Sequence, residues 1–284
     1  MAELLPSQPL ETRCPPLPLR RYNGFWLPEA VLTEVAAIHA RLQARPSDVF
    51  LASFPKSGTT WLKALAFATA HRAKHPPSGA GHPLRRMNLH ECVRFMEMDP
   101  ELRRDASSLS PRLHATHLPF CLLPESITGG EGAAPASRIV YVCRNPKDAR
   151  LGAVLCEEGL IGWEASLTRP KQVLFLEYER MLHDPKATVK KLAEFMGCGF
   201  SKEEEEGGVV DEIVKLCSLK ELKNMEVNRS GGSQAGVRNE AYFRKGSSGD
   251  WRNHLTPEMA KQLEKIVEDA LQGSGFAFVD DAIM

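Results

Sequence analysis

Three short apolar runs stand out along the chain, and they predict the strands of a buried sheet. They occupy residues 49–52, 138–143 and 173–178. Each run is nearly continuous in apolar residues, which is typical of parallel strands that helices cover on both faces. Because helical patterns alternate with these runs, the sequence predicts an α/β fold, a single domain with an open parallel β-sheet flanked by helices.

Hydrophobic periodicity and end signals predict the main helices. Residues 28–43 repeat apolar positions at helical spacing, and residues 61–68 are nearly all apolar, as in a buried helix. Two later segments have a capping residue and a proline at the start and a glycine beyond the end. One runs from Asp184 to Gly197, and the other from Thr256 to about Leu271.

Proline- and glycine-rich stretches mark the segments outside these elements. Residues 1–22 are rich in proline and predict an irregular N-terminal arm, which leaves a single domain over residues 23–284. Residues 71–86 and 124–137 have the composition of loops.

The turn after the first strand carries the strongest functional signal of the chain. It contains Pro55-Lys56-Ser57-Gly58-Thr59-Thr60-Trp61. A strand, a tight turn and a helix place backbone N–H groups at the helix start, where they bind an anion, and Gly58 lets the backbone approach such a ligand closely. A lysine and three hydroxyls in one turn indicate a phosphate or sulfate site. The alternative is an ordinary capped turn, because Ser and Thr favour helix starts.

The same turn differs from the Walker motif of nucleoside-triphosphate binders. That motif ends in Gly-Lys-Ser or Gly-Lys-Thr, and neither tripeptide occurs in this chain, where Lys56 precedes Gly58. The sequence therefore predicts a P-loop-like nucleotide-binding architecture with different phosphate chemistry, and it argues against a nucleotide kinase.

Charge and cysteine usage narrow the class of protein. The 284 residues include 36 Lys and Arg against 36 Asp and Glu, whereas a general polyanion binder usually has a basic excess; we expect no nucleic-acid partner. Seven cysteines are scattered without a Cys-x-x-Cys pair, residues 1–18 lack the apolar core of a signal peptide, and no apolar run approaches the ~20 residues of a membrane span. We predict a cytoplasmic protein with no membrane partner; its oligomeric state stays open.

His117 is a candidate general base. It lies in the segment Ala115-Thr116-His117-Leu118-Pro119. The proline keeps the residue before it extended, and histidine titrates near neutral pH, so it can take a proton from a hydroxyl. The alternatives are that His117 is a bystander or that His114 has the role. His71 and His75 lie beside a proline-rich loop, and we expect both on the surface.

Cations at two further places are candidates for binding a second phosphate. Arg144 directly follows the second strand, and the ligands of parallel sheets gather at the carboxyl ends of strands. An arginine there can clamp a phosphate with two hydrogen bonds; the alternative is a surface salt bridge with Asp148. Residues 242–251 combine Arg244 and Lys245 with glycines and serines, as in a phosphate loop or a basic surface turn.

Together these segments resemble the cytosolic sulfotransferases, and specifically their plant branch. The resemblance extends over residues 26–278 and rests on four motifs in the family's order: Pro55-Lys56-Ser57-Gly58-Thr59-Thr60-Trp61, Ala115-Thr116-His117-Leu118-Pro119, Arg144-Asn145-Pro146-Lys147-Asp148, and Arg244-Lys245-Gly246 with Gly249-Asp250-Trp251. The family uses 3′-phosphoadenosine 5′-phosphosulfate (PAPS) as its donor. The resemblance therefore implies a PAPS-dependent transferase that sulfates small molecules.

The resemblance also implies a role for each candidate residue. His117 would be the general base, and Lys56 would stabilise charge on the leaving oxygen. Binding of PAPS is implied for the turn residues Lys56, Ser57, Gly58, Thr59 and Thr60, for the 3′-phosphate ligands Arg144, Arg244, Lys245 and Gly246, and for Trp61, Tyr178 and Ser218 around the adenine. No metal is implied, because these cations replace the role of magnesium.

The chain departs from the family after Asp148. Relatives have a serine there that binds the 3′-phosphate and restrains the catalytic lysine, but no serine or threonine occurs here before Ser166. Only 24 residues separate Asp148 from Val173, fewer than in relatives, although a crossover of about 10–12 residues can still close a sheet. We infer an internal deletion. A second departure is Leu219, where relatives commonly place an aromatic residue against the adenine.

Two functions follow from this reasoning. The first is an active sulfotransferase that transfers a sulfuryl group from PAPS to a hydroxyl of a small acceptor of flavonoid, steroid or hormone type. The second is a catalytically impaired relic that binds PAPS or its product without turnover, which the missing serine and the shortened 149–172 region favour. The acceptor stays open, because variable loops form the walls of its pocket.

Overall fold

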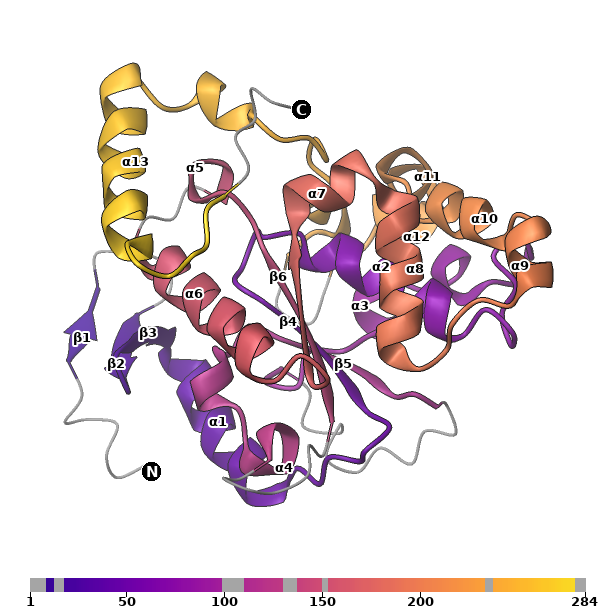
Figure 1. Ribbon diagram of the computed structural model, residues 1–284, viewed down its shortest axis with the longest axis horizontal. Coiled ribbons are helices and arrows are strands. Elements are labelled where there is room, and N and C mark those ends of the chain that lie inside the picture. Colours follow the sequence, from indigo (N-terminus) through magenta and orange to yellow (C-terminus); the bar gives the residue numbers. More distant parts are fainter. Residues whose placement is uncertain are drawn as a thin grey trace.

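A four-stranded parallel sheet forms the centre of the computed structural model, which describes residues 9–12, 18–98, 110–129, 137–149, 153–232 and 237–278 (Figure 1). The strand order is β5-β4-β6-β7, and each neighbouring pair is parallel. The strands are β4 (Val49–Ser53), β5 (Leu113–Thr116), β6 (Arg138–Cys143) and β7 (Val173–Glu177). All three predicted apolar runs are therefore strands, and β5 is added at one edge.

Alternate residues of the central strands face two separate hydrophobic cores. In β4, Val49 and Leu51 join one core, whereas Phe50 and Ala52 join the other. Helices on opposite sides of the sheet cover these cores (Figure 1). The first core is packed by α2 (Thr59–Ala70), α8 (Pro185–Met196) and α10 (Val209–Leu216), and the second by α1 (Glu29–Arg41), α6 (Ala153–Thr168) and α13 (Pro257–Leu271). The predicted sheet flanked by helices is confirmed.

The described part of the N-terminal segment is more regular than the predicted irregular arm. Three short strands form a small antiparallel sheet: β1 (Leu10–Glu11), β2 (Leu19–Tyr22) and β3 (Phe25–Pro28). Asn23 and Gly24, both at positive φ, make the turn between β2 and β3. An Asn-Gly pair is the sequence signal for such a hairpin, and the proline-rich composition around it concealed that signal. The boundary at residue 23 falls inside this hairpin and stays a prediction.

Short helices and turns connect the main elements, and several predicted boundaries differ from the observed ones. α2 begins at Thr59, two residues earlier than predicted, the third strand ends at Glu177 rather than at Tyr178, and both predicted loops contain a helical turn. The short elements are α3 (Leu89–Cys92), α4 (Glu125–Thr128), α5 (Pro146–Ala149), α7 (Tyr178–His183), α9 (Lys202–Glu206), α11 (Leu219–Asn224), α12 (Glu226–Arg229), η2 (Pro83–Arg85), η4 (Phe120–Leu122), η5 (Asn239–Tyr242) and η6 (Asp250–Asn253).

The predicted surface position of His71 is wrong. Its side chain is buried at the end of α2, where its ring meets the Phe67 ring edge-on with 4.9 Å between centroids. His75 is half-buried and stacks on the same phenylalanine. The apolar helix, rather than the proline-rich loop, determines the place of His71. Burial lowers the pKa of His71 to about 4, helped by the nearby charges of His75 and Lys74.

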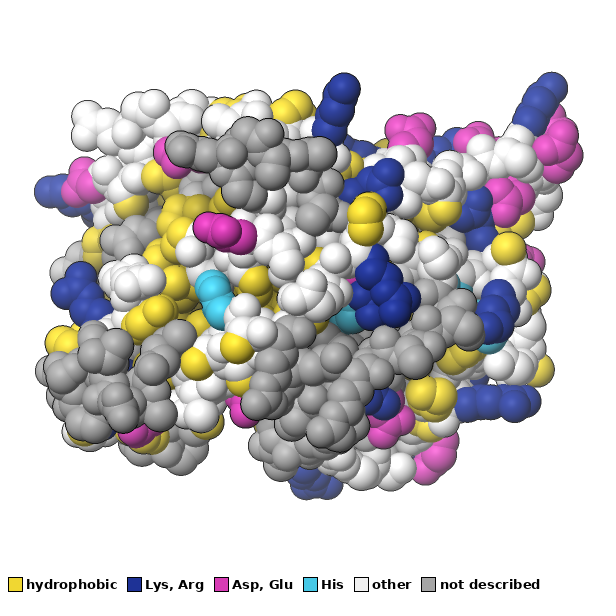
Figure 2. All heavy atoms as spheres, turned by 90° about the horizontal axis from the view of Figure 1, so that it is seen from below, with side chains coloured by type: hydrophobic (Ala, Val, Ile, Leu, Met, Phe, Trp, Pro, Cys, Tyr) yellow, Lys and Arg dark blue, Asp and Glu magenta, His cyan; other side chains and the backbone are white. Residues whose placement is uncertain are grey.

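Charged side chains of both signs are scattered over the surface. Figure 2 shows lysines and arginines beside aspartates and glutamates in its right-hand half, over the helices at the right of Figure 1, with apolar side chains between them. Among the described residues, no helix has both the length and the apolar character that a membrane crossing requires.

Candidate active site

The predicted site residues converge at the carboxyl ends of the strands. Because β4, β5, β6 and β7 are parallel, they end at the same edge of the sheet, where the anion turn, His117, Arg144 and Tyr178 follow them. A cavity of about 750 Å³ lies there. Every predicted site residue except Ser57 lines it. The structure thus brings together segments that lie far apart in the sequence.

The turn between β4 and α2 has an unusual backbone. Lys56 and Gly58 both adopt positive φ, at 71° and 105°. This conformation suits glycine but is uncommon for lysine, and holding it costs on the order of 1 kcal/mol. The N–H of Ser57 donates to the carbonyl oxygen of Phe54 over 3.2 Å and closes the turn. Successive backbone N–H groups in such a turn form a concave anion site at the helix start.

Tyr178 packs so closely against Gly58 that a side chain does not fit there. A β-carbon on Gly58 would lie 2.5 Å from the Cδ2 atom of Tyr178. The buried tyrosine ring also meets Trp61 edge-on, with 5.8 Å between centroids, and the Arg144 guanidinium lies 4.4 Å from its centre. Tyr178 therefore joins the anion turn after β4 to the cation after β6.

Two buried polar atoms of the predicted donor-site residues have no hydrogen-bond partner among the described residues. They are the Ser57 hydroxyl oxygen and the Arg144 Nε–H. Thr59, by contrast, shares a hydrogen bond of 2.5 Å with the hydroxyl of Ser53. An unpaired buried polar group costs about 1–3 kcal/mol. Because Arg144 lines the cavity, an anion bound there can satisfy its Nε–H.

Arg144 forms an ion pair with Asp148, but the pair is buried rather than on the surface. Its Nη2 atom lies 3.6 Å from the Asp148 carboxylate and donates to the carbonyl oxygen of Ser247 over 2.8 Å. Both charged side chains are less than a tenth exposed. The surface salt bridge that we considered is therefore wrong, and the arginine is positioned by buried contacts while still lining the cavity.

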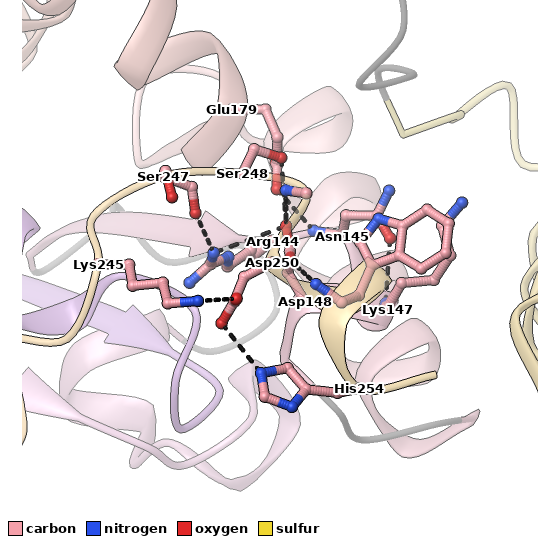
Figure 3. A network of polar contacts seen from close by, with 12 residues as sticks. Arg144, Asn145, Lys147, Asp148, Glu179, Lys245, Ser247, Ser248, Asp250 and His254 are labelled. Carbon is pink, nitrogen blue, oxygen red and sulfur yellow. Dashed lines mark hydrogen bonds and ion pairs between the residues drawn. The ribbon is translucent and has the colours of Figure 1, made fainter. Parts of the chain in front are cut away.

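Asp148 also fastens a distant loop to the sheet (Figure 3). Its carboxylate accepts the backbone N–H of Gly249 over 2.8 Å and that of Trp251 over 3.0 Å, and it accepts the hydroxyl of Ser248 over 3.2 Å. These bonds join residues that are about a hundred positions apart in the chain. The candidate phosphate loop is thus held beside Arg144 by contacts within the chain.

The cations of this loop are exposed to solvent. Arg244 and Lys245 line the cavity, and the ammonium of Lys245 pairs with Asp250, whose carboxylate lies 3.4 Å from His254 (Figure 3). That pairing is the main reason why the pKa of Asp250 lies well below its ordinary value. Gly246 has φ of 63°, so this loop, like the turn after β4, exposes its backbone at a glycine.

The start of α11 lies against this loop and also lines the cavity. Ser218 caps the helix by accepting the N–H of Glu221 over 3.2 Å. Leu219 follows, and a β-carbon on Gly246 would lie 2.6 Å from its Cδ2 atom. The leucine that replaces the expected aromatic residue therefore packs against the phosphate loop and also lines the cavity.

His117 is held by a hydrogen bond that fixes its tautomer. Its Nδ1 lies 2.7 Å from the carbonyl oxygen of Ser53, and a carbonyl can only accept, so the proton is on Nδ1 and Nε2 keeps its lone pair. Burial lowers the pKa of His117 to about 4, against the effect of the Ser53 bond and with help from the charges of Lys63 and Lys56. The ring is therefore neutral near pH 7 and able to accept a proton at Nε2.

The alternative base, His114, lies away from the cavity. It is buried in β5, where its ring stacks on Phe50 at 5.1 Å and its Nε2 lies 4.0 Å from the Asp48 carboxylate. Two positions along an extended strand separate His114 from the end of β5, whereas His117 follows that end directly. In the part of the chain that the structure describes, His117 lines the cavity and His114 does not.

Sequence reasoning missed a group of buried polar residues behind His117. Glu97 accepts the backbone N–H of His117 over 2.6 Å, and Lys63 lies 2.8 Å from His90. Burial raises the pKa of Glu97 to about 7 and lowers that of Lys63 to about 7. The available signal was Lys63, a lone lysine in an otherwise apolar helix. The contacts of Asp148 with its loop had no signal in the sequence.

Comparison with protein families identifies the family of the chain. The family model described as "Sulfotransferase domain" matches residues 46–151 and 158–275. The chain belongs to the sulfotransferase family. The predicted family membership and enzyme class are therefore confirmed.

Plant relatives resemble this sulfotransferase over most of its length. Cytosolic sulfotransferase 8 of Arabidopsis thaliana is 40% identical over 309 aligned positions, which cover 96% of this chain and 91% of the relative. Cytosolic sulfotransferase 5 of the same plant is 38% identical and covers 91% and 90%. These names agree with the predicted plant-type family and cytoplasmic location.

Solved structures confirm the fold. A candidate steroid sulphotransferase of Arabidopsis thaliana is 32% identical and superposes with a TM-score of 0.75, over 98% of this chain and 94% of that one. Retinol dehydratase, in complex with androsterone and the inactive cofactor PAP, is 20% identical with a TM-score of 0.70, over 96% and 93% of the two chains. The second similarity shows the shared fold alone.

The family match is interrupted between residues 151 and 158, inside the region where we inferred a deletion. The alignment with cytosolic sulfotransferase 8 has 309 positions, more than the 284 residues of this sulfotransferase, so the relative has residues that this chain lacks. The helix α6 nevertheless occupies Ala153–Thr168 and leads into β7, which pairs with β6 along its length. The sheet therefore closes across the 24 residues between Asp148 and Val173, and the deletion at this place stays a prediction.

Proposed function

We propose that this sulfotransferase transfers the sulfuryl group of PAPS to a hydroxyl of a small molecule of flavonoid, steroid or hormone type. The observation that carries the proposal is that His117, with its proton on Nδ1, lines the same cavity as the anion turn around Lys56. A neutral base and an anion-binding turn in one cavity suit a reaction in which a hydroxyl attacks an anionic donor.

The donor site is supported by the chemistry of its residues. Lys56 and the turn's backbone N–H groups suit the 5′-phosphosulfate, and Arg144, with an unpartnered buried Nε–H, suits the 3′-phosphate together with Arg244, Lys245 and the Gly246 backbone. The rings of Trp61 and Tyr178, with Ser218, suit the adenine. Retinol dehydratase and a mouse sulfotransferase have each been solved with PAP, which supports the same nucleotide here.

The proposed reaction transfers one group and one proton. The acceptor oxygen forms a bond to sulfur while the bond from sulfur to the oxygen of the 5′-phosphate breaks, and the hydroxyl proton passes to Nε2 of His117. The products are the sulfate ester and PAP. Lys56 and the adjacent N–H groups stabilise the charge that develops on the leaving oxygen, the part of the reaction where preorganised donors contribute most.

We expect the reaction to need no metal ion. Lys56, Arg144, Arg244 and Lys245 place four cations around one cavity, and these can balance the charge of the donor as magnesium does for nucleoside triphosphates. Transfer rates measured with added magnesium and with a chelator test this expectation directly: equal rates support it, and a loss of transfer on chelation contradicts it.

A catalytically impaired relic is the second candidate. The absence of a serine between Asp148 and Ser166 and the interruption of the family match favour it, because the residue expected to restrain the catalytic lysine is missing. Against it, Asp148 holds the phosphate loop through Gly249 and Trp251, so this loop has contacts that do not involve the missing serine.

One experiment separates the two candidates. Calorimetry with PAP measures nucleotide binding, and incubation with sulfur-labelled PAPS and a panel of phenols and alcohols measures transfer. Binding together with a labelled product supports the active enzyme, whereas binding without product for the whole panel supports the relic. A chain that is folded but binds no PAP contradicts both.

A further inference from the structure

Lys63 is a fully buried lysine directly behind two residues that line the cavity. Its ammonium lies 2.8 Å from the Nδ1 atom of His90 and 4.1 Å from the centre of the Phe95 ring. A buried charge costs several kcal/mol unless its partners compensate, and an apolar side chain would fill this position in α2 at less cost. We therefore expect Lys63 to affect the side chains that it contacts.

The contact with Lys63 fixes which nitrogen of His90 has the proton. Below its pKa of about 7, Lys63 is an ammonium group with donors and no acceptor, so Nδ1 of His90 accepts its hydrogen bond. Burial, followed by the charges of Lys63 and His117, lowers the pKa of His90 to about 3, and the ring is neutral. A neutral imidazole has one N–H, which in His90 must be on Nε2. His90 and His117 are thus opposite tautomers in one cavity.

The Nε2–H of His90 is a donor without a hydrogen-bond acceptor among the described residues. The atom is buried and has no hydrogen-bond partner among the described residues, although His90 lines the cavity. Neighbouring rings hold the imidazole in place: Phe95 stacks on it at 5.7 Å and 18°, and Tyr242 lies 4.1 Å away at 48°. A donor that is oriented this firmly and left unpaired indicates that a ligand supplies the missing acceptor.

We propose that His90 is a specificity-determining residue whose Nε2–H binds a second oxygen of the acceptor molecule while the reacting hydroxyl meets His117. The proposal rests on the proposed function of the cavity and adds the chemical class of the acceptor. Lys63 has a positioning role, because it acts on the acceptor only through the tautomer of His90.

The spacing of the two histidines limits the acceptor further. Their rings lie within about 10 Å of each other, because the Phe95 centroid is 5.7 Å from that of His90 and 4.5 Å from that of His117. The intervening surface is the Phe95 ring, which favours an apolar and planar body. The acceptor is therefore a small ring compound with a hydroxyl for transfer and a carbonyl, ether or hydroxyl oxygen up to several ångströms away.

Matched acceptors test the second oxygen without changing size. 6-Methoxy-2-naphthol has one reacting hydroxyl and a distant accepting oxygen, and 6-ethyl-2-naphthol has the same shape without that oxygen. 4′-Methoxy-4-hydroxybiphenyl and its 4′-ethyl analogue give the same comparison at a longer spacing. In the wild-type protein we expect kcat/KM for the methoxy compound of at least one pair to exceed that of its ethyl partner by about three- to tenfold, the effect of one hydrogen bond.

Two variants of His90 separate the donor from the ring. His90→Phe keeps the aromatic packing and removes the N–H, and we expect the methoxy preference to fall to about one. His90→Gln places an amide N–H near the position of Nε2, and we expect it to retain a preference. Affinity for PAP, measured by calorimetry, should be unchanged in both, because His90 lies outside the donor site.

A spectroscopic measurement tests the tautomer itself. Nitrogen-15 spectra of the wild-type protein near pH 6, where Lys63 is charged and both rings are neutral, should show a protonated Nε2 and a bare Nδ1 for His90, and the reverse for His117. In Lys63→Met the bare Nδ1 of His90 loses its donor, and we expect the signal of that ring to move toward a mixture of both tautomers. A wild-type His90 with its proton on Nδ1 overturns the proposal.

The outcomes distinguish this inference from the proposed function. If the wild type sulfates these acceptors but shows equal kcat/KM for methoxy and ethyl partners, or if His90→Phe keeps the wild-type preference, the role of His90 is wrong and the transferase function stands. If the wild type transfers to none of these acceptors and to none of the wider panel of phenols and alcohols, the proposed function fails and the inference fails with it.

Discussion

The carboxylate of Asp148 accepts the backbone N–H of Gly249 over 2.8 Å, and this bond joins the end of β6 to the candidate phosphate loop (Figure 3). The same carboxylate lies 3.6 Å from the Arg144 guanidinium. One buried acidic residue therefore holds both halves of the proposed 3′-phosphate site.

Asp148→Asn should loosen this site. The substitution removes the charge that faces Arg144 and leaves a buried cation poorly paired, which typically costs about 3 kcal/mol of the free energy of unfolding. We expect the Kd for PAP, measured by calorimetry, to rise by about tenfold, which corresponds to ~1.4 kcal/mol. Asp269→Asn, at an exposed position of α13, is the control. Unchanged PAP affinity in Asp148→Asn would show that the loop keeps its place by other contacts.

His117→Ala should separate binding from chemistry. The variant lacks the proposed base but keeps the backbone N–H that donates to Glu97. We expect transfer to fall by at least about 10²-fold, the usual contribution of a general base, with the Kd for PAP nearly unchanged. Wild-type turnover in this variant contradicts the assignment of the base.

The low pKa of His117 predicts where kcat/KM falls on the acid side of the pH profile. Since that pKa is about 4, the ring stays neutral and competent well below the ordinary histidine pKa of ~6.5. The kcat/KM of the wild type should therefore be lost only as pH falls toward 4, within the range where the protein remains folded. A loss of kcat/KM centred near 6.5 would show that burial does not control this group.

Gly58→Ala should disrupt the anion turn. Gly58 has φ of 105°, and its new methyl group would stand 2.5 Å from Cδ2 of Tyr178, so both the backbone and the tyrosine must shift. We expect a loss of stability of about 1–3 kcal/mol together with weaker PAP binding. Gly199→Ala is the matched control, because no atom lies within 4 Å of a β-carbon there. Equal thermal stability and affinity in the two variants would rule out the close approach.

Acid should destabilise the protein partly through His71. Its pKa is about 4 in the folded chain and ~6.5 when unfolded, so the unfolded state binds the proton more tightly. The contribution of His71 to the free energy of unfolding is fully present above pH ~6.5 and is lost as pH falls through 4. His71→Leu removes this dependence, and between pH 8 and 4.5 it should lose about 2 kcal/mol less than the wild type in urea unfolding. Parallel losses in the two proteins contradict this account.

The sequence predicted the fold well where local patterns are strong. The apolar run over residues 138–143 matches β6, and the run over residues 173–178 contains all of β7 and one residue more. The end signals at Asp184 and Gly197 predicted α8 almost to the residue. The antiparallel strands β1, β2 and β3 escaped prediction, because strands of two to four residues show little alternation and a proline-rich composition precedes and surrounds them.

The candidate site was predictable where a residue follows a strand, and not where it depends on contacts across the fold. Lys56, Arg144 and His117 each stand just beyond a strand end, so the parallel sheet alone brings them together. The partners of Asp148 and Lys63 are 101 and 27 positions away. Such pairs have no local pattern, and neither Asp148 nor Lys63 was among the site residues predicted from the sequence.

The most direct test of the account is the Kd for PAP and the rate of sulfuryl transfer in Lys56→Met. Lys171→Met is the control. Lys171 is exposed near the amino end of β7, whereas the cavity lies at the carboxyl ends of the strands. The account predicts that Lys56→Met weakens PAP binding by about tenfold or more and lowers transfer by at least about 10²-fold, whereas the control behaves as wild type. Unchanged affinity and transfer in Lys56→Met would contradict the account.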